Sequence, residues 1–323
     1  MKRIFKLGLL AAVMAFVLLS SALYASEDKA FLLSRVSEVQ DARLRSTLEN
    51  SIKVGLINNS KELDAALKKD AISRKKNNNS NLAAIRAKIS EQAAPLKGLD
   101  KDKISVTKND KGNKLFGKIT GEVPASYKKF IALSAKFDPK TNTSELPHNE
   151  KAITDFFNSI KDDPTIKHAL KVTNTTIQDM QRNWFSKGAG FEHVFSGEVK
   201  GSKVSGYHFW YKFYDDEAKG YAKKGDSMAG IGNPRIFTGS FTWQPNGKGG
   251  DAFKRKGGFT IGHSPQILLA LGHIAIEAAK SEGAVPSAYT FYADINGESF
   301  LWQMYTLGGS IRSLYPMAPQ NKK

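Results

Sequence analysis

The chain has 323 residues and no cysteine, and its 48 basic and 31 acidic residues give it a formal net charge of +17. The missing cysteine excludes disulfides, thiol nucleophiles and cysteine-based zinc sites, and a hydrophobic content of 41% excludes a wholly disordered chain. The positive charge indicates a polyanionic partner such as nucleic acid, anionic lipid or acidic glycan, without choosing among them.

The first 25 residues have the pattern of a secretory signal peptide. Three basic residues precede an apolar run from Leu7 to Leu19, and small residues follow up to Ala25. The alternative is an uncleaved anchor, because the apolar stretch is nearly long enough to span a bilayer. We expect a cleaved signal and a secreted or periplasmic protein that is not stably inserted in a membrane. Cleavage would remove three positive charges and no negative one, which leaves +14.

Residues 26–97 are predicted to be a helical N-terminal region. Apolar residues recur at three- and four-residue steps from Leu32 to Ile52, and the same spacing resumes at Leu82 and ends at Pro95. The polar run 74–81 is predicted to be a loop. This pattern is typical of an amphipathic helical hairpin or a short coiled coil, and nothing in it indicates chemistry.

The rest of the chain is predicted to be an α+β unit with antiparallel sheets. Residues 98–127 are polar with few apolar positions, which predicts a linker or a segment of loosely packed strands. Residues 128–318 begin with helices, one of which starts at Pro164, and helices followed by strands predict an α+β domain. Residues 319–323 form a basic tail. The segments with strand composition are 190–214, 235–243, 256–262, 287–295 and 298–306, and one apolar helix is expected at 265–281.

His193 and His208 lie in the two strands of a predicted β-hairpin with Gly201-Ser202 as its two-residue turn. Counting back from this turn places Phe195 opposite His208. The two histidines would then lie on one face of the hairpin as diagonal neighbours, with their backbones about 7–8 Å apart. A turn one residue longer or shorter would put them on opposite faces.

Two imidazoles at such a spacing suit the cleavage of RNA by its own 2′-hydroxyl. A neutral ring can take the hydroxyl proton, and a protonated ring can give a proton to the leaving 5′-oxygen. The phosphorane gains negative charge and needs a cation, for which the run Lys254, Arg255 and Lys256 is the candidate. A lone histidine is more often a core or surface residue, and we expect such roles for the other four: His148, His168, His263 and His273.

Three segments resemble the EndoU family of poly-U-specific endoribonucleases, which is related to the coronavirus uridylate-specific endoribonucleases. They are the run 190–214 with both histidines, FTIGHSP at 259–265 and SLYP at 313–316. The likeness covers about residues 149–317 and does not reach 26–127. It implies an EndoU-like domain that cuts single-stranded RNA at uridines and leaves 2′,3′-cyclic phosphate and 5′-hydroxyl ends. DNA, which has no 2′-hydroxyl, would not be cut.

The resemblance also implies roles for single residues. His208 is the expected base and His193 the expected acid, with Lys254 as the catalytic lysine and Lys256 as its runner-up and a substrate-binding residue. The remaining residues at matching positions are Ser264, Ser313 and Tyr315 for the uracil, and Glu192 and Glu198 as supporting acidic residues. Manganese dependence is implied as well, although no carboxylate cluster in the sequence has metal-ligand spacing.

Two further interpretations stay open. A catalytically silent, exported RNA- or polyanion-binding protein on the same fold would keep the basic charge and need none of the site residues. Deployment as a toxin or effector, with an unknown immunity or inhibitor protein as its partner, concerns the use of the chemistry and not the chemistry itself.

Overall fold

The computed structural model describes residues 29–39, 42–109, 112–140, 146–229, 235–295 and 298–317. The predicted signal peptide, residues 1–25, and the basic tail, residues 319–323, lie outside the described residues. The chain divides into two compact units, Met1–Ser80 and Asn81–Lys323. Within the described part of the chain, no helix combines the length and the apolar character needed to cross a membrane.

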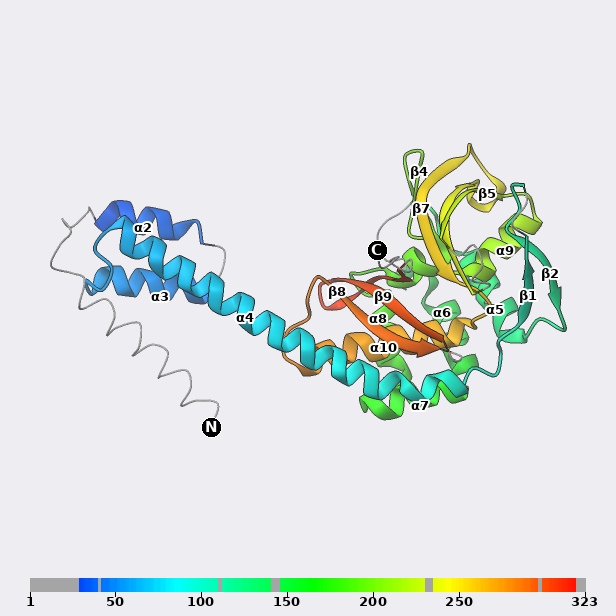
Figure 1. Cartoon of the computed structure of the whole chain (residues 1–323), viewed down its shortest axis with the longest axis horizontal. Helices are drawn as coiled ribbons and strands as arrows, with labels where there is room; N and C mark the ends of the chain where they lie inside the picture. Colours follow the sequence, from blue (N-terminus) through cyan, green and yellow to red (C-terminus); the bar gives the residue numbers. More distant parts are fainter. Residues whose placement is uncertain are drawn as a thin grey trace. The chain divides into compact units, whose positions relative to one another are not determined.

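The first unit is helical, in agreement with the spacing of its apolar residues. It contains α2 (Lys29–Ser37), α3 (Ala42–Lys53) and the beginning of α4 (Ser60–Ala93), drawn in blue to cyan in Figure 1. The loop predicted for 74–81 is wrong, because α4 continues through this polar run. The run contains neither glycine nor proline, the two residues that interrupt a helix most strongly. The buried hydrophobic residues of this unit are Leu32, Val36, Leu48, Ile52, Ile57 and Leu63.

The second unit confirms the predicted α+β class. Its helical segments are η1 (Ala94–Gly98), α5 (Ala125–Ser134), α6 (Leu146–Ile160), α7 (Pro164–Thr173), α8 (Ile177–Phe185), the π-helical turn η2 (Glu192–Ser196), α9 (Trp210–Ala218), η3 (Pro245–Gly247) and α10 (Pro265–Ser281). Its strands are β1 (Ser105–Lys108), β2 (Phe116–Thr120), β3 (Glu198–Lys200), β4 (Lys203–Ser205), β5 (Ala222–Ala229), β6 (Ile236–Trp243), β7 (Ala252–Thr260), β8 (Ala288–Ile295), β9 (Glu298–Leu307) and β10 (Ser310–Pro316).

The described strands form a two-stranded, a five-stranded and a three-stranded sheet. The five-stranded sheet has the order β3-β4-β7-β6-β5, and its pairs are antiparallel except for β4 with β7. The three-stranded sheet, β10-β9-β8, is antiparallel throughout. Strand β10 contacts β7 and η2 as well as α8 and α10. It therefore joins the two larger sheets, which are seen side by side in Figure 1.

Residues 98–127 contain strands, one of the two expectations from the sequence, but they are neither a linker nor a loosely packed segment. Strands β1 and β2 pair as an antiparallel hairpin, and Leu115 and Phe116 are buried in the main hydrophobic cluster. The carboxylate of Glu217 accepts hydrogen bonds from the backbone N–H groups of both residues, at 2.6 and 2.9 Å. Few apolar residues are enough here, because Phe116 packs edge-on against Trp210 at 5.7 Å between ring centroids.

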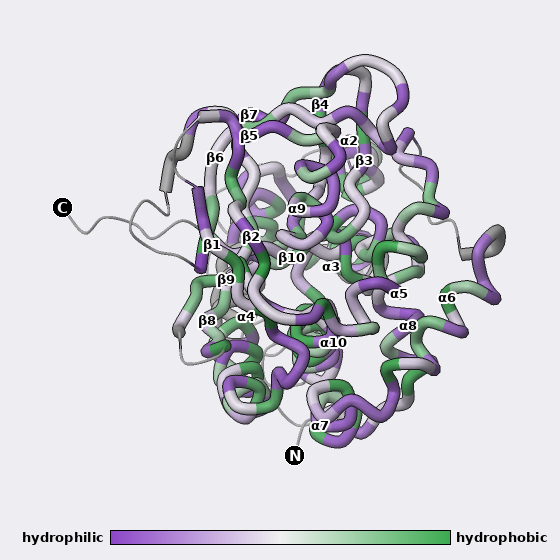
Figure 2. The backbone as a smooth tube through the Cα atoms, turned by 90° about the vertical axis from the view of Figure 1, so that its right-hand side faces the viewer, coloured by the Kyte–Doolittle hydropathy of each residue, from purple (hydrophilic) through white to green (hydrophobic). Residues whose placement is uncertain are grey.

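Helix α10 lies at the centre of the core and has the bounds predicted for the apolar helix at 265–281. It is buried over nearly its whole length and drawn mainly in green in Figure 2. Pro265 occupies the first helical position, and the Ser264 hydroxyl accepts a hydrogen bond from the Ile267 N–H at 3.3 Å. Proline and a serine cap are the residues that favour such a helix start.

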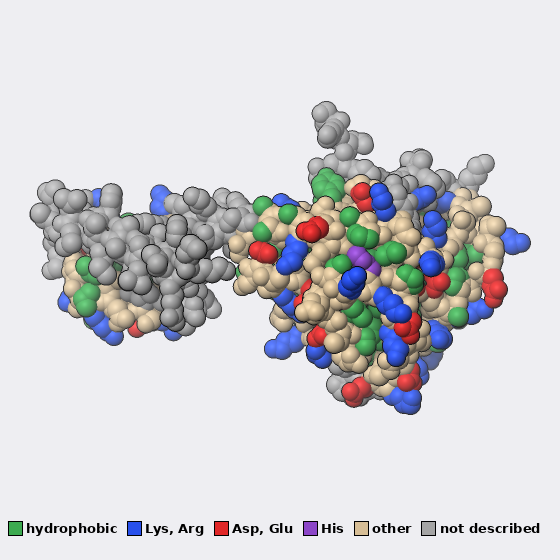
Figure 3. Space-filling model, turned by 90° about the horizontal axis from the view of Figure 1, so that it is seen from below, with side chains coloured by type: hydrophobic (Ala, Val, Ile, Leu, Met, Phe, Trp, Pro, Cys, Tyr) green, Lys and Arg blue, Asp and Glu red, His purple; other side chains and the backbone are tan. Residues whose placement is uncertain are grey.

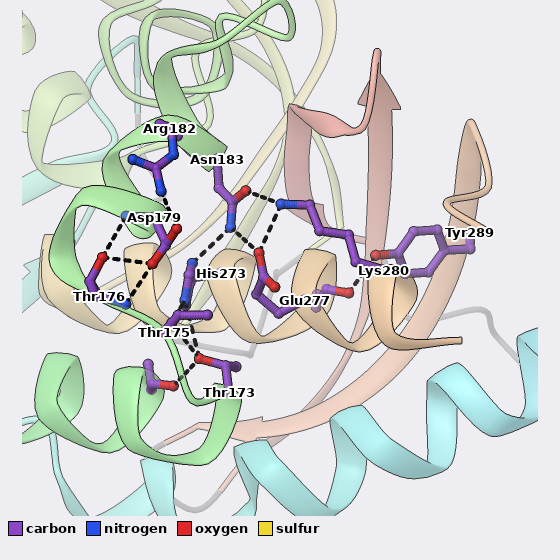
Figure 4. Close-up of polar contacts among 12 residues, drawn as sticks. Thr173, Thr175, Thr176, Asp179, Arg182, Asn183, His273, Glu277, Lys280 and Tyr289 are labelled. Atoms are coloured by element: carbon purple, nitrogen blue, oxygen red, sulfur yellow. Dashed lines mark hydrogen bonds and ion pairs between the residues drawn. The ribbon is translucent and has the colours of Figure 1, made fainter. Parts of the chain in front are cut away.

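A buried polar network joins α8 to α10 (Figure 4). The Asn183 amide donates to Nδ1 of His273 at 2.9 Å and to Glu277 at 2.8 Å. The other ring nitrogen of His273, Nε2, donates to the Thr175 hydroxyl at 2.7 Å. Burial lowers the pKa of His273 to about 4, so the ring is neutral near pH 7. The network holds His273 in a structural position, as expected for a histidine outside the site.

Candidate active site

The hairpin between the two histidines is shorter than predicted. The Gly201-Ser202 turn forms, and Lys200 pairs with Lys203 across it. The strands β3 and β4 have only three residues each, however, so His193 falls in η2 and His208 follows β4. The derivation of their common face from strand alternation is therefore wrong, although the turn itself is correct.

Backbone hydrogen bonds bring His193 and His208 together instead. The His193 carbonyl accepts from the Tyr207 N–H at 2.7 Å, and the Val194 carbonyl accepts from the His208 N–H at 2.6 Å. Gly206 permits this approach, because it has a φ of +64° and a Cβ there would lie 1.9 Å from the His193 carbonyl oxygen. The centroids of the two imidazole rings lie 6.0 Å apart. One phosphate can fit between rings at this distance.

Tyr207 fixes the backbone just before His208. Its φ of +67° is uncommon for a residue with a bulky side chain. The Tyr207 ring stacks on Trp243 at 4.7 Å between centroids, and its hydroxyl donates to the buried Asp216 carboxylate. Trp243 donates to the same carboxylate at 2.9 Å. These contacts hold Tyr207 in its left-handed conformation and so determine where the His208 ring lies.

The His208 ring is buried and held through one nitrogen. Its Nδ1–H donates to the Gly258 carbonyl at 2.9 Å, and the Tyr315 ring stacks on it at 4.7 Å with an interplanar angle of 20°. Burial, together with the positive charge of Lys254 and the neighbouring His193, lowers the pKa of His208 well below its usual value. The ring is therefore neutral near pH 7, with an unprotonated Nε2 that can act as a base.

The His193 ring is held in the same way by a carboxylate. Its Nδ1–H donates to Oε2 of Glu198 at 2.9 Å. Burial lowers the pKa of His193. The hydrogen bond and negative charge of Glu198 raise it, and the positive charges of Arg312 and Lys254 lower it further. Because the depression is larger at His208, His193 takes the first proton of the pair. The order of protonation thus suits an acid at His193 and a base at His208.

Lys254 places a cation beside both rings. Its Nζ donates to the Gly206 carbonyl at 2.9 Å, and its charge lowers the pKa of each histidine. Burial lowers the pKa of Lys254 itself to about 8, with Glu198 acting in the opposite direction. Lys254 is therefore charged at neutral pH and loses its charge in mildly alkaline solution.

These side chains share one pocket of about 1120 Å³ in the second unit. Six of the residues predicted for the site line it: His193, His208, Lys254, Lys256, Ser313 and Tyr315. Ser313 is buried, and its hydroxyl has no hydrogen-bond partner within the part of the chain that the structure describes. Burial and the hydrogen bond with Tyr305 raise the pKa of Tyr315 to about 12, so its ring stays neutral.

Comparison with known proteins identifies the family of the chain. A family model described as Endoribonuclease XendoU matches residues 70–316, which is more than half of the chain. The chain belongs to the XendoU endoribonuclease family. The resemblance to EndoU proteins drawn from the sequence motifs is thereby confirmed.

Several curated relatives of this XendoU-family chain match over part of their length. The uridylate-specific endoribonuclease of Homo sapiens is 35% identical over 112 residues, which are 29% of this chain and 25% of that protein. The Paralichthys olivaceus protein of the same name is 33% identical over 110 residues, 30% of this chain and 27% of that protein. Uridylate-specific endoribonuclease B of Danio rerio is 29% identical over 171 residues, 44% and 58% of the two chains. The chain therefore spans less than two thirds of each of these relatives.

The solved structure of XendoU, titled a splicing-independent snoRNA processing endoribonuclease, shares the fold. It superposes with a TM-score of 0.57 at 20% sequence identity and covers 72% of this chain and 97% of that one. The likeness shows that this chain has the XendoU fold.

Three predicted residues of the XendoU-family site do not line the pocket. Ser264 is fully buried, its hydroxyl caps α10, and its N–H donates to Asp100 at 3.1 Å. The prediction that it contacts uracil is corrected accordingly, because its hydroxyl is used to begin the helix. Glu192 is buried in η2 beside His193. Glu198 acts on the site through the His193 ring, where a supporting acidic residue would lie.

Two residues that the sequence analysis missed belong to the site. Arg312 lines the pocket and forms two hydrogen bonds with Glu198, at 3.0 and 2.7 Å. Thr238 also lines the pocket, and its buried hydroxyl has no hydrogen-bond partner among the described residues. Arg312 had a sequence signal, since it is the one charged residue in the strand 310–316. Thr238 had none, because threonine is common in strands.

The resemblance implies manganese, but the described residues of the site do not form a set of ligands for it. Among the residues that the structure describes, no group of three or more His, Asp or Glu side chains is arranged to hold a metal ion. Glu198, the acidic side chain bonded to His193, also binds Arg312. We therefore derive no step of the chemistry through a metal.

Proposed function

We propose that this chain is an endoribonuclease that cuts single-stranded RNA at uridines by attack of the ribose 2′-hydroxyl. The observation that carries the proposal is the arrangement of His193 and His208, 6.0 Å apart beside Lys254. Each ring is held through its Nδ1 atom, which leaves Nε2 for the substrate. Membership of the XendoU family supports the same chemistry.

The reaction follows from the protonation states of the two rings. Nε2 of His208 takes the proton of the 2′-hydroxyl, and the oxygen attacks the adjacent phosphorus. As the bond to O5′ breaks, protonated His193 gives its Nε2 proton to the leaving oxygen. Lys254 stabilises the negative charge that develops on the phosphorane. The products are a 2′,3′-cyclic phosphate and a 5′-hydroxyl, and DNA is not cut because it has no nucleophile at this position.

The pocket has the charge expected for an RNA site. Its lining contains five basic side chains, Lys200, Lys203, Lys254, Lys256 and Arg312, and no acidic one among the described residues. On the face of the molecule seen in Figure 3, by contrast, blue basic side chains are interspersed with red acidic ones. The basic lining favours a phosphate backbone at the pocket over non-specific adhesion to the whole surface.

Incubation with oligonucleotides that contain one uridine among adenosines tests the proposal. We expect a single cut at the uridine, and no cut in the matched oligonucleotide in which cytidine replaces uridine. Parallel reactions with and without manganese measure the metal dependence that the family resemblance implies. Binding of the oligonucleotide without any cut would instead support the catalytically silent RNA-binding alternative.

Export is part of the proposal and rests on the predicted signal peptide at 1–25 alone. We propose a secreted or periplasmic enzyme, for which use as a toxin or effector is one deployment. An immunity or inhibitor protein would then be a partner. Detection of the chain in culture medium or periplasmic extract, with a new N-terminus that follows Ala22 or Ala25, tests the export.

Replacing Ser313 with alanine is expected to relax base choice more than it lowers the rate at uridine. The buried Ser313 hydroxyl has no partner within the described structure, so it is available to a base edge. A site that hydrogen-bonds one base discriminates because the wrong base leaves a buried group unpaired. Ser310→Ala is the matched control, since Ser310 is buried on the same strand but does not line the pocket. An unchanged cleavage pattern on mixed-sequence RNA would remove Ser313 from this role.

The pH dependence of kcat/KM is expected to show three transitions. It should rise as pH increases through the depressed pKa of His208, because the base must be neutral. It should fall through the pKa of His193, which burial holds below its usual value, because the acid must be protonated. It should fall further above about pH 8, where Lys254 loses its charge. Steady-state rates at uridine measure this profile, and an increase in kcat/KM from pH 7 to pH 9 would contradict these roles.

A further inference from the structure

Arg312 connects the centre of β10 to the acid side of the site. Its Nη1 donates to Oε1 of Glu198 at 3.0 Å and its Nη2 donates to Oε2 at 2.7 Å. Nη1 also donates to the Gly188 carbonyl at 3.2 Å, which fixes the guanidinium from a second side. A two-bonded arginine–carboxylate pair has a defined geometry that lysine cannot reproduce.

Glu198 is shared between Arg312 and His193. Its side chain is 3% exposed, and Oε2 accepts from both Arg312 and His193. Burial alone would raise the pKa of Glu198, but the hydrogen bonds from His193 and Arg312 outweigh it and hold that pKa below the usual value. The Glu198 carboxylate is therefore negatively charged. It has two partners: the Arg312 guanidinium, which is permanently positive, and the His193 ring, which gains and loses a proton.

We propose that Arg312 is a positioning residue that holds Glu198 against Nδ1 of His193 and thereby fixes the ring and its transferable proton opposite the leaving 5′-oxygen. Without Arg312 the Glu198 carboxylate would bond to His193 alone and would hold the proton on the ring more tightly. The positive charge of Arg312 favours release of this proton from His193. The kinetic part of this inference rests on the proposed function, whereas its effect on the His193 ring does not.

The charged groups around His193 set the direction of the effect. Glu198 on β3 raises the pKa of His193, while Arg312 on β10 and Lys254 on β7 lower it. His208, 6.0 Å away, is the remaining titratable ring beside it. Removing the charge of Arg312 takes away one lowering influence and leaves Glu198 with its full charge on the ring. The pKa of His193 should then rise.

Titration of the His193 ring by NMR tests the proposal in the full chain without RNA. Arg312→Gln keeps one N–H donor to Glu198 but no charge, and we expect the pKa of His193 to rise by about one unit. Arg312→Lys keeps the charge but not the two-bonded geometry, so the pKa should rise by less than in Arg312→Gln. Arg86→Gln is the matched control, because Arg86 also makes two bonds, to the backbone carbonyl and hydroxyl of Thr290, but does not line the pocket.

A second comparison covers the case in which Arg312→Gln leaves the buried carboxylate too poorly paired to fold. In a Glu198→Gln background there is no carboxylate to leave unpaired, and adding Arg312→Gln should again raise the pKa of His193. In the Arg312→Gln variant with Glu198 intact, the fall of kcat/KM with increasing pH should move to higher pH. The size of this move should equal the rise in the pKa of His193 measured by NMR. An unchanged His193 pKa in folded Arg312→Gln, or an equal change in the lysine variant, would overturn the proposal. Because the titration needs no substrate, it gives a result even if the chain proves to cut no RNA.

Discussion

Replacing His208 or His193 with alanine should lower cleavage at uridine by about a hundredfold to ten-thousandfold each, the usual contribution of one general acid or base. Alanine at 208 removes the base beside the 2′-hydroxyl, and alanine at 193 removes the proton for the leaving oxygen. The double variant should be little worse than either single one, since groups that act as one unit are non-additive. Single-turnover rates on a uridine oligonucleotide measure all three.

The binding of RNA should survive both histidine substitutions. Neutral imidazoles add little to a pocket lined by five basic side chains. His168→Ala is the matched control: this histidine donates to the Gln92 carbonyl at 2.7 Å and does not line the pocket, so its loss should leave the rate unchanged. Near wild-type cleavage by His208→Ala would remove the base from the mechanism, whatever the family membership of the chain.

Replacing Lys254 with alanine should cost about a hundredfold to a thousandfold in kcat, comparable to the loss of one oxyanion donor. Lys254 lies beside both histidines and hydrogen-bonds the Gly206 carbonyl, so its charge is fixed where the phosphorane forms. Lys256→Ala, the neighbouring lysine in the same pocket, should mainly raise KM and reduce the salt dependence of binding. If Lys256→Ala were inactive and Lys254→Ala active, the two roles would be exchanged.

Structural features that depend on a local pattern follow correctly from the sequence. The apolar run at 265–281, begun by Ser264-Pro265, folds as α10 with the predicted bounds, and the Gly201-Ser202 turn forms as predicted. Such features depend on spacing and turn chemistry within a few residues. The same holds for the α+β class, which follows from the order of helical and strand patterns.

The histidine pair shows the limit of that reasoning. Both residues were found, but their approach depends on positive φ angles at Gly206 and Tyr207 and on the π-helical turn η2. Strand alternation cannot predict any of these, because each is held by contacts distant in sequence, such as Tyr207 on Trp243. Arg312 escaped notice for a similar reason, since its partner Glu198 is 114 positions away in the chain.

Two other predictions differ from the structure because the same residue type can have more than one structural role. Ser264 stands before a proline-initiated helix, and a serine there serves as a cap as readily as a substrate contact. Residues 98–127 looked like a linker because they contain few apolar residues, but Phe116 and its neighbours insert into an aromatic cluster. Composition alone does not show which of a few apolar residues have a partner to pack against.

Analysis of the ends left on a chimaeric substrate tests the central claim most directly. The substrate is an oligodeoxynucleotide with one ribouridine, compared with the same strand carrying 2′-O-methyluridine at that position. The account predicts one cut after the ribouridine, with a 2′,3′-cyclic phosphate on one fragment and a 5′-hydroxyl on the other, and no cut in the methylated strand. Cleavage of the methylated strand, or fragments with 3′-hydroxyl and 5′-phosphate ends, would contradict attack by the 2′-hydroxyl.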